Sequence, residues 1–294
     1  MNLPIAAPEF AAEIVTRFAP SPTGYLHLGH VRSALAGWQA ARMAAGRFLL
    51  RLEDIDQGRC RDIYARAIVE DLAWLGLNWD GAVRRQSQHL DDYRHALARL
   101  EMLGVLYPCF CTRRTIRAEI AAAGGAPHDL PVPYPGICRR RSGDERAMKI
   151  AAGADFAVRL DLARARALTG PVYWIEQDET GSRRVEATPE ALGDVVLARK
   201  DAPASYHLAV TVDDALQAVT LVTRGVDLFA ATHIHRVLQA LLGLPVPHYR
   251  HHALLTDAAG RRLSKRDGAV TVRAMRAAGA SPQQILAAAQ SSGR

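Results

Sequence analysis

Residues 14–30 read IVTRFAPSPTGYLHLGH. Residues 14–20 have the apolar composition of a short buried strand, and the Pro- and Gly-containing loop behind them leads into a helix that begins at His30. Free backbone N–H groups and the helix dipole make such a helix start a binding site for anions. Imidazoles at His27 and His30 can donate hydrogen bonds to phosphate oxygens placed there. On its own, the pair is also compatible with a capped helix start whose histidines have no chemical role.

Strand and helix patterns alternate on the C-terminal side of this stretch. Apolar residues with helical spacing occupy 30–45, a second buried strand is predicted at 48–54, and further helices are predicted over 63–75 and 93–103. This order is typical of an α/β protein with a doubly wound, Rossmann-type parallel sheet. The pattern is expected to resume late in the chain, with strands at 195–199, 205–213, 218–224 and 251–257 and a helix at 228–243.

The middle of the chain differs in composition. Residues 106–190 contain three of the four cysteines, a Gly- and Pro-rich span and short strand patterns. We therefore expect an inserted α+β subdomain with a small core of its own. The discontinuous catalytic domain is then expected to comprise 1–105 and 191–260, and 261–294 to form a polar loop followed by a short helical tail.

Composition and charge narrow the class of protein. The chain has 294 residues, is 49% hydrophobic and carries a formal net charge of +7, which is typical of a folded chain with a sizeable core and excludes a disordered one. It has no apolar run of about 18 residues, and its N-terminus lacks the basic region of a secretion signal. We therefore expect a cytoplasmic protein with no membrane association. The basic excess permits an anionic partner such as a nucleic acid.

Lysine is rare among the basic side chains. Of the 37 basic residues, only Lys149, Lys200 and Lys265 are lysines, and the others are arginines. A lysine retained in such a chain indicates a position where a compact ammonium is needed. Lys265 lies in a second distinctive motif, RLSKR at 262–266, which follows a predicted strand. By itself, a Ser-Lys-Arg loop is more often a solvated turn.

The motifs HLGH at 27–30 and RLSKR at 262–266 together resemble the HIGH and KMSKS signatures of class I aminoacyl-tRNA synthetases. The wider context, RFAPSPTGYLHLGHVRSAL from Arg17 and RLEDID from Arg51, is similar to the glutamyl/glutaminyl branch of that family. The resemblance extends over nearly the whole chain. It implies a class I catalytic fold and a reaction in which L-glutamate and ATP, accompanied by Mg²⁺, form glutamyl-adenylate.

The resemblance also implies roles for individual residues. Arginines suit the substrate carboxylates as planar bidentate donors, and a glutamate side chain can pair with the substrate ammonium. Three side chains are expected to be catalytic, namely His27, His30 and Lys265, and ATP is expected to contact Gly29 and Ser264 in addition. The residues expected to form the glutamate pocket are Arg17, Phe18, Ala19, Pro20, Ser21, Glu53, Tyr206 and Arg224.

Three cysteines in the middle of the chain, Cys109, Cys111 and Cys138, suggest a metal site, because Zn²⁺ is bound by thiolates in closed tetrahedral sites. On spacing alone, buried free cysteines are the alternative. In small glutamyl-synthetase-like proteins, a tyrosine four residues before the last cysteine is the fourth ligand, and Tyr134 has that position. The resemblance therefore implies one structural zinc held by the three cysteines and Tyr134. His128, in the long span before Tyr134, is the alternative fourth ligand.

The length of the C-terminal part bears on which RNA group accepts the glutamate. Only 28 residues follow Arg266, fewer than an anticodon-binding domain requires, so we expect that domain to be absent. The resemblance to short paralogues of the glutamyl branch implies tRNA-independent activation by a monomer and transfer of glutamate to the queuosine base at the wobble position of tRNA(Asp).

Three alternatives to this function remain. They are a truncated conventional glutamyl-tRNA synthetase that charges the 3′ end of tRNA(Glu), a nucleotidyltransferase of the same fold that acts on another acid, and a catalytically inactive nucleotide-binding regulator. The inactive regulator is disfavoured because HLGH, Glu53, Arg224 and Lys265 are all present. The matches to the glutamate pocket disfavour a different acid.

Overall fold

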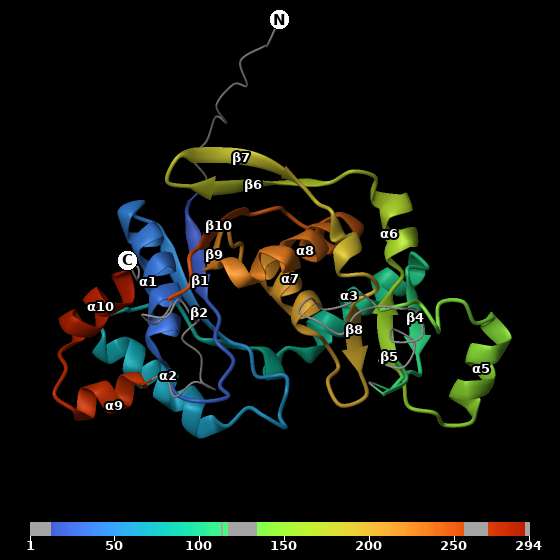
Figure 1. The fold of residues 1–294 in the computed structure, drawn as a ribbon, viewed down its shortest axis with the longest axis horizontal. Coiled ribbons are helices and arrows are strands. Elements are labelled where there is room, and N and C mark those ends of the chain that lie inside the picture. Colours follow the sequence, from blue (N-terminus) through green and yellow to red (C-terminus); the bar gives the residue numbers. More distant parts are fainter. Residues whose placement is uncertain (1–12, 113, 117–133, 256–269, 292–294) are drawn as a thin grey trace, which may run out of the picture.

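The computed structural model describes residues 13–112, 114–116, 134–255 and 270–291. Two groups of mostly parallel strands lie side by side, a small antiparallel sheet lies at one end of the molecule, and the C-terminal helices lie at the other end (Figure 1). No helix within these ranges is long and apolar enough to cross a lipid bilayer.

The first sheet is parallel throughout and has the order β1-β2-β3. Its strands are β1 Val15–Phe18, β2 Arg47–Leu52 and β3 Arg84–Arg85, and helices α1 Leu28–Met43 and α2 Asp62–Trp74 connect them. Each residue of β1 is buried, and β2 is buried after its first residue. This burial agrees with the predicted continuous apolar strands, which are typical of parallel sheets covered by helices.

The second sheet has the order β7-β6-β10-β9, in which the β6–β7 hairpin is antiparallel and the other pairings are parallel. Its strands are β6 Tyr173–Asp178, β7 Gly181–Glu186, β9 Leu221–Gly225 and β10 His248–His252. Strand β9 lies beside β1, where the Thr220 N–H donates to the Val15 carbonyl oxygen over 2.9 Å.

The order in which the chain adds strands reverses between β1 and β9. Helix α1 leads from β1 to β2 on one side, whereas α8, Phe229–Leu242, leads from β9 to β10 on the other. In open α/β sheets, ligands bind at such a switch point, outside the carboxyl ends of the strands. The ends of β1 and β9 therefore mark the expected site.

The small antiparallel sheet has the order β4-β5-β8. It consists of β4 Leu106–Cys109, β5 Ala157–Leu160 and β8 Val196–Arg199, with helices α3 Leu90–Met102, α5 Gly143–Ala151 and α6 Leu162–Thr169 nearby. Helices α9 Val272–Ala277 and α10 Pro282–Gln290 form the tail, and short 3₁₀ turns span η1 Gln86–Gln88, η2 Pro189–Ala191 and η3 Val226–Leu228. Helix α10 begins at Pro282 because the Ser281 side chain accepts the Gln284 N–H as a cap, and proline is favoured in the first helical turn.

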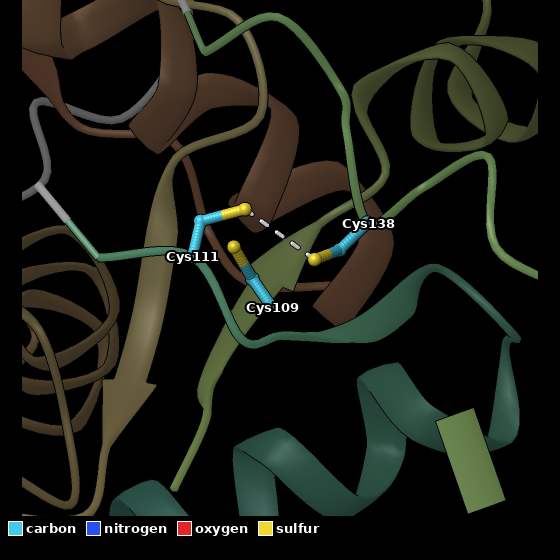
Figure 2. A group of neighbouring side chains, drawn as sticks. All are labelled: Cys109, Cys111 and Cys138. Atoms are coloured by element: carbon cyan, nitrogen blue, oxygen red, sulfur yellow. Dashed lines mark hydrogen bonds between the residues drawn. The ribbon is translucent and has the colours of Figure 1, made fainter. Parts of the chain in front are cut away.

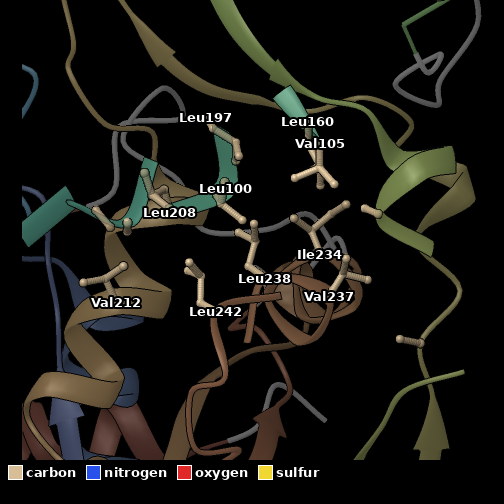
Figure 3. Close-up of a cluster of buried hydrophobic side chains, with 14 of the residues drawn as sticks. Leu100, Val105, Leu160, Leu197, Leu208, Val212, Ile234, Val237, Leu238 and Leu242 are labelled. Atoms are coloured by element: carbon tan, nitrogen blue, oxygen red, sulfur yellow. The ribbon is translucent and has the colours of Figure 1, made fainter. Parts of the chain in front are cut away.

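One hydrophobic core joins the small sheet to the parallel strands (Figure 3). Helix α7, Tyr206–Leu216, and helix α8 supply much of it. Its buried members include Leu100 of α3, Leu160 of β5, Leu197 of β8, Leu208 and Val212 of α7, and Ile234 and Leu238 of α8. Because both sheets contribute to the same cluster, burial of apolar surface holds them in a fixed relation.

One strand predicted in the C-terminal half is wrong, and another is a strand but belongs to a different sheet. Residues 205–213 belong to the start of α7, where the Ser205 side chain accepts the Leu208 N–H as a cap. Every residue from Leu208 to Asp214 is buried, so the run lacks the polar face that distinguishes a helix from a buried strand. Residues 195–199 contain β8, which pairs antiparallel with β5 and does not join the parallel strands.

The last predicted strand is displaced, because β10 spans His248–His252 and not 251–257. The sheets also cross the predicted boundaries of the inserted subdomain. Strand β6 pairs with β10, and β8 pairs with β5, so the second sheet and the small antiparallel sheet each contain strands from both predicted parts. The division into a catalytic domain and an insertion stays a prediction.

Candidate active site

A cavity of about 400 Å³ lies at the carboxyl ends of β1 and β9. Many of the predicted site residues line it, although they come from separate parts of the chain. They are Arg17, Phe18, Ala19, Pro20, Ser21, His27, Gly29, His30, Glu53, Tyr206 and Arg224. Ser264 and Lys265 lie outside the described residues. The structure thus brings the HLGH turn and the residues expected to form the glutamate pocket together around one cavity, while the role of each residue stays a prediction.

The HLGH turn holds its two histidines in defined protonation states. The Gly29 N–H donates to His27 Nδ1 over 3.1 Å, and the His27 N–H donates to His30 Nδ1 over 3.2 Å. A neutral imidazole has one donor and one acceptor nitrogen, so both rings carry their proton on Nε2. A Cβ at Gly29 would lie only 3.0 Å from His27 Cε1. A side chain at this position would therefore crowd the His27 ring that caps the helix.

Arg17 is fixed by an acidic residue behind the cavity. Its Nε and Nη2 donate to the two carboxylate oxygens of Asp214 over 2.9 and 3.2 Å, and its Nη1 donates to the Thr223 carbonyl oxygen. Arg51 Nη2 lies 2.9 Å from Asp214 Oδ1. Burial raises the pKa of Asp214, but Arg17 and Arg51 outweigh it and hold this pKa below its ordinary value. The charge of Arg17 is therefore compensated and its position is fixed.

Glu53 lies at the edge of the cavity, beside the loop that follows β1. Its N–H donates to the Pro20 carbonyl oxygen over 3.0 Å, and its Oε1 is 3.7 Å from Arg51 Nη2. Burial raises the pKa of Glu53 to about 7, against the opposing effect of Arg51. The carboxyl group is thus close to half ionised at neutral pH, and a cation bound beside it stabilises the ionised form.

Arg224 differs from the other buried arginines of the site. It is 5% exposed, and it donates to His251 Nε2 over 3.1 Å, to the Tyr206 hydroxyl over 3.2 Å and to Thr232 Oγ1 over 2.5 Å. Its Nη1 is also 3.3 Å from His235 Nδ1. Within the described parts of the chain, no carboxylate oxygen lies within 4 Å of its guanidinium.

The histidines around Arg224 add no charge. Burial and the neighbouring Arg224 hold the pKa of His235 well below its ordinary value, and the same causes lower the pKa of His207 to about 4. Both rings are neutral near pH 7, so Arg224 is a buried cation surrounded by neutral acceptors. Because an unpaired buried charge is costly, this end of the cavity is suited to an anion. A carboxylate fits best, since it can accept two hydrogen bonds from one guanidinium.

A second cavity of about 300 Å³ adjoins the first, and both are lined by Ser21, Glu53 and Tyr206. On its far side it is lined by Val196 and Arg199 of β8 and by other residues of the segment that leads into α7. A group in the second cavity can therefore approach a molecule in the first from the side of the small sheet.

Three thiols beside the small sheet, one of them at the end of β4, point toward one another (Figure 2). The sulfur atoms of Cys109, Cys111 and Cys138 all lie within 4.8 Å of one another. The Tyr134 hydroxyl is 3.4 Å from both Cys109 Sγ and Cys111 Sγ. The Phe110 N–H donates to Cys138 Sγ, and although burial raises the pKa of this thiol, its hydrogen bonds lower it to about 7. This group can hold a metal ion, and His128 lies outside the described residues.

Several residues of the site were not predicted from the sequence. Asp214 and Arg51 lie behind the cavity, and His251 and His235 surround Arg224. The adjacent acids Asp213 and Asp214, within an otherwise apolar run, were the available indication that this run has buried polar partners. The histidines carried no comparable indication, because their contacts come from other elements.

Comparison with known proteins agrees with this geometry. A family model described as tRNA synthetases class I (E and Q), catalytic domain, matches residues 13–293. The chain is 49% identical over 279 residues to the Glutamyl-Q tRNA(Asp) synthetase of Rhodobacter capsulatus, covering 92% of this chain and 98% of that protein. It is 43% identical over 286 residues to the protein of the same name from Symbiobacterium thermophilum, covering 92% and 83% of the two chains.

Solved structures give the same result for the fold. The crystal structure of Glutamate-tRNA Synthetase from Elizabethkingia anophelis matches with a TM-score of 0.73 and 29% identity. The match covers 87% of this chain and 53% of that one. The chain therefore spans about half the length of that protein.

Proposed function

Because the chain belongs to the class I tRNA synthetases for glutamate and glutamine, we propose that it activates L-glutamate with ATP and transfers the glutamate to the queuosine base at the wobble position of tRNA(Asp). It is a ligase of the aminoacyl-tRNA synthetase type. The observation that supports glutamate as the substrate is the position of Arg224. This residue is a buried cation that lines the cavity and has no carboxylate partner among the described residues. The acceptor follows from the names of relatives that this chain matches over most of their length.

The activation step uses the residues around the first cavity. Arg224 and Arg17 hold the carboxylates of glutamate, Glu53 pairs with its ammonium, and the Tyr206 hydroxyl helps to orient it. A carboxylate oxygen attacks the α-phosphorus of ATP, the bond to the bridging oxygen breaks, and pyrophosphate leaves with the bonding electrons. The Nε2–H groups of His27 and His30 donate to the phosphate oxygens as charge moves onto them. Gly29 and Ser264 complete the ATP contacts, and Mg²⁺ accompanies the nucleotide.

In the transfer step, a hydroxyl of the queuosine ring attacks the carbonyl carbon of the adenylate and displaces AMP, and an ester is formed. We propose that this ring enters through the second cavity. The position of the second cavity supports this route, because that cavity shares Ser21, Glu53 and Tyr206 with the glutamate pocket. Bases of a single-stranded loop can be splayed out and inserted into such a cavity.

The activation step has a direct test. We expect exchange of labelled pyrophosphate into ATP that depends on glutamate and needs no tRNA, because the groups for adenylate formation all belong to this chain. Exchange that begins only after tRNA is added would contradict this expectation. Aspartate and glutamine serve as controls, since the first is too short and the second lacks the charged side-chain carboxylate.

The acceptor is tested with labelled glutamate and defined RNAs. We expect labelling of tRNA(Asp) that contains queuosine, and of an isolated anticodon stem–loop that contains it, but not of the same RNAs with guanosine or of tRNA(Glu). The stem–loop has no amino-acid acceptor end, so its labelling separates a base acceptor from a terminal ribose. Labelling of tRNA(Glu) alone would instead support a conventional glutamyl-tRNA synthetase.

The affinity for glutamate should depend on pH through Glu53. Its pKa of about 7 means that the side chain loses its charge as the pH falls through neutrality, and a neutral carboxyl group pairs poorly with the substrate ammonium. We expect the KM for glutamate to rise as the pH falls from 8 to 6, by about tenfold per unit well below the pKa. Glu53→Gln should raise this KM and abolish its pH dependence. A slope that persists in Glu53→Gln would assign the titration to another group.

We propose that the cysteine group holds one structural zinc ion through Cys109, Cys111, Tyr134 and Cys138. The donor set fits, because zinc prefers a closed tetrahedral arrangement of thiolates in structural sites, and the Phe110 N–H supports one sulfur. The ion would stabilise the fold around β4 and take no part in adenylate formation.

Metal removal tests this site. We expect about one zinc per chain by elemental analysis, and a strong chelator or Cys109→Ser should lower the melting temperature by several degrees. The kcat of exchange at low temperature should change little. Tyr134→Phe should weaken zinc retention, whereas His128→Ala should not. Protein that contains no zinc and has three freely titratable thiols would exclude the site.

A further inference from the structure

Three neighbouring strands place a row of buried polar side chains behind Arg224. In the register of the sheet, Arg224 of β9 pairs with His251 of β10, and Glu176 of β6 pairs with Tyr249 of β10. Arg224 Nε donates to His251 Nε2 over 3.1 Å, and His251 Nδ1 lies 2.8 Å from Glu176 Oε1. The side chains of His251 and Glu176 are 2% and 5% exposed. The row therefore runs from the cavity into the protein interior and is excluded from water.

The chemistry of the row determines where its protons lie. An arginine nitrogen can only donate, so His251 Nε2 must accept and the proton of the ring must be on Nδ1. That N–H then donates to Glu176 Oε1, which also accepts the His251 backbone N–H over 3.0 Å, while Glu176 Oε2 accepts Trp174 Nε1–H over 3.0 Å. Burial raises the pKa of Glu176, but the hydrogen bonds from His251 and Trp174 outweigh it and hold the carboxylate ionised.

We propose that His251 and Glu176 are positioning residues for the substrate carboxylate. This inference rests on the proposed function. Glu176 fixes the tautomer of His251, and His251 in turn holds the Nε edge of Arg224. The Nη edge is thereby kept toward the cavity that the substrate enters. Neither positioning residue lines this cavity.

The neutral ring of His251, which lies between Arg224 and Glu176, has a second consequence. A carboxylate bonded directly to Arg224 would occupy the donors that the substrate needs, as Asp214 occupies two donors of Arg17. Because His251 lies between them, Glu176 attracts Arg224 only from a longer distance, which lowers the cost of burying the guanidinium. The Nη groups of Arg224 are still without a carboxylate acceptor among the described residues. The row thus favours a substrate carboxylate over a neutral amide of the same shape.

Matched variants separate positioning from general stability. His251→Asn keeps an amide near the Nδ1 position and so keeps the link to Glu176, whereas His251→Gln keeps an acceptor near the Nε2 position for Arg224. Glu176→Gln removes the charge and one of the two accepting oxygens. Asp178→Asn on the same strand is the control, because Asp178 is bonded to Thr180 in an exposed turn. For each protein we would measure the KM for glutamate and for ATP in pyrophosphate exchange, glutamate binding by calorimetry, inhibition by glutamine, and the melting temperature.

We expect Glu176→Gln and His251→Asn to raise the KM and Kd for glutamate by about tenfold. Each variant loosens the row that holds Arg224 in place, and Arg224 makes the charge-assisted contact to the substrate carboxylate. The KM for ATP and the kcat should stay within about twofold, because a loss of substrate binding raises the KM for that substrate without slowing the chemical step. His251→Gln should recover part of the affinity, and the preference for glutamate over glutamine should fall in step with the affinity. The Asp178→Asn control should match the unmodified protein.

Two results would overturn the inference. The first is an unchanged KM for glutamate in Glu176→Gln. The second is a parallel rise in both KM values together with a lower melting temperature, because that pattern indicates only a structural role. Absence of glutamate binding and of exchange in the unmodified protein would instead refute the proposed function, so the two failures are distinguishable.

Discussion

Replacement of Arg224 by methionine is expected to raise the KM for glutamate by about 100-fold or more, while the KM for ATP changes little. The contacts to His251, Tyr206, His235 and Thr232 leave one N–H of the guanidinium for the substrate. A charge-assisted hydrogen bond contributes about 1.5–3 kcal/mol, and a loss of about 3 kcal/mol corresponds to a factor of more than 100 in affinity. Arg224→Lys should recover only part of the loss, because an ammonium keeps the charge but not the planar set of donors.

The same substitution is expected to cost less stability than the loss of an arginine that is paired directly with buried carboxylates. Arg224 has no carboxylate within 4 Å among the described residues, so its removal breaks no direct ion pair, and Glu176 loses only a longer-range attraction through His251. Arg51→Met is the instructive contrast, because Arg51 is fully buried 2.9 Å from Asp214 and 3.7 Å from Glu53. Its loss leaves Asp214 with Arg17 as its remaining counter-charge and removes the guanidinium beside Glu53, and breaking buried pairs of this kind costs about 3–5 kcal/mol. Thermal unfolding of the two variants measures this difference.

Arg250→Met is the control for activity. Arg250 is on β10, is exposed and is bonded to Gln177, so its removal should leave both KM values unchanged. If Arg224→Met retained its affinity for glutamate, or if its KM for ATP rose equally, the assignment of Arg224 to the substrate carboxylate would be wrong.

The second large effect is expected at Lys265. Lys265→Ala should lower the kcat of glutamate-dependent exchange by about 30- to 1,000-fold, the range found when one donor to a developing charge is removed. The proposed partner of the ammonium is the charge that forms on the departing pyrophosphate. The loss should therefore appear in kcat and kcat/KM, with little change in glutamate binding measured by calorimetry.

The scarcity of lysine supplies the controls for this experiment. Lys200 pairs with Asp155 on the surface, and Lys200→Ala should leave turnover unchanged. Lys265→Arg should be impaired, because a planar guanidinium is a poor substitute for a compact ammonium. Normal turnover of Lys265→Ala, or normal turnover of Lys265→Arg, would count against the proposed role.

Features that depend on local chemistry could be predicted from the sequence. The strand, loop and helix start at 14–30 lie where predicted, because a glycine-containing loop and a capped helix are encoded within a few residues. His27 caps α1 through Gly29, only two residues away. The proximity of Cys111 to Cys138, 27 positions away, is not local in this sense, and its prediction depended on the resemblance as well as on the spacing.

Helix α7 shows where pattern alone fails. Periodicity identifies a helix by contrast between an apolar and a polar face, and this helix is packed between α8, α3 and the parallel strands with nearly all sides covered. Its adjacent acids, Asp213 and Asp214, are buried because Arg51, Arg84 and Arg17 reach them from other elements. No single stretch of sequence contains both halves of these ion pairs.

By itself, therefore, the sequence indicated which side chains are expected to meet ATP and an amino acid, because several of them lie in short motifs whose geometry is local. Only the tertiary structure decided which of the buried charges are compensated. Arg17 meets Asp214 across 197 positions of the chain, and His251 meets Glu176 across 75. Such contacts depend on strand order and register, which hydrophobic patterns leave open. Whether a buried charge is compensated depends on distance and burial in three dimensions. For this reason the sequence could not show that Arg224 lacks a direct carboxylate partner while Arg17 has one.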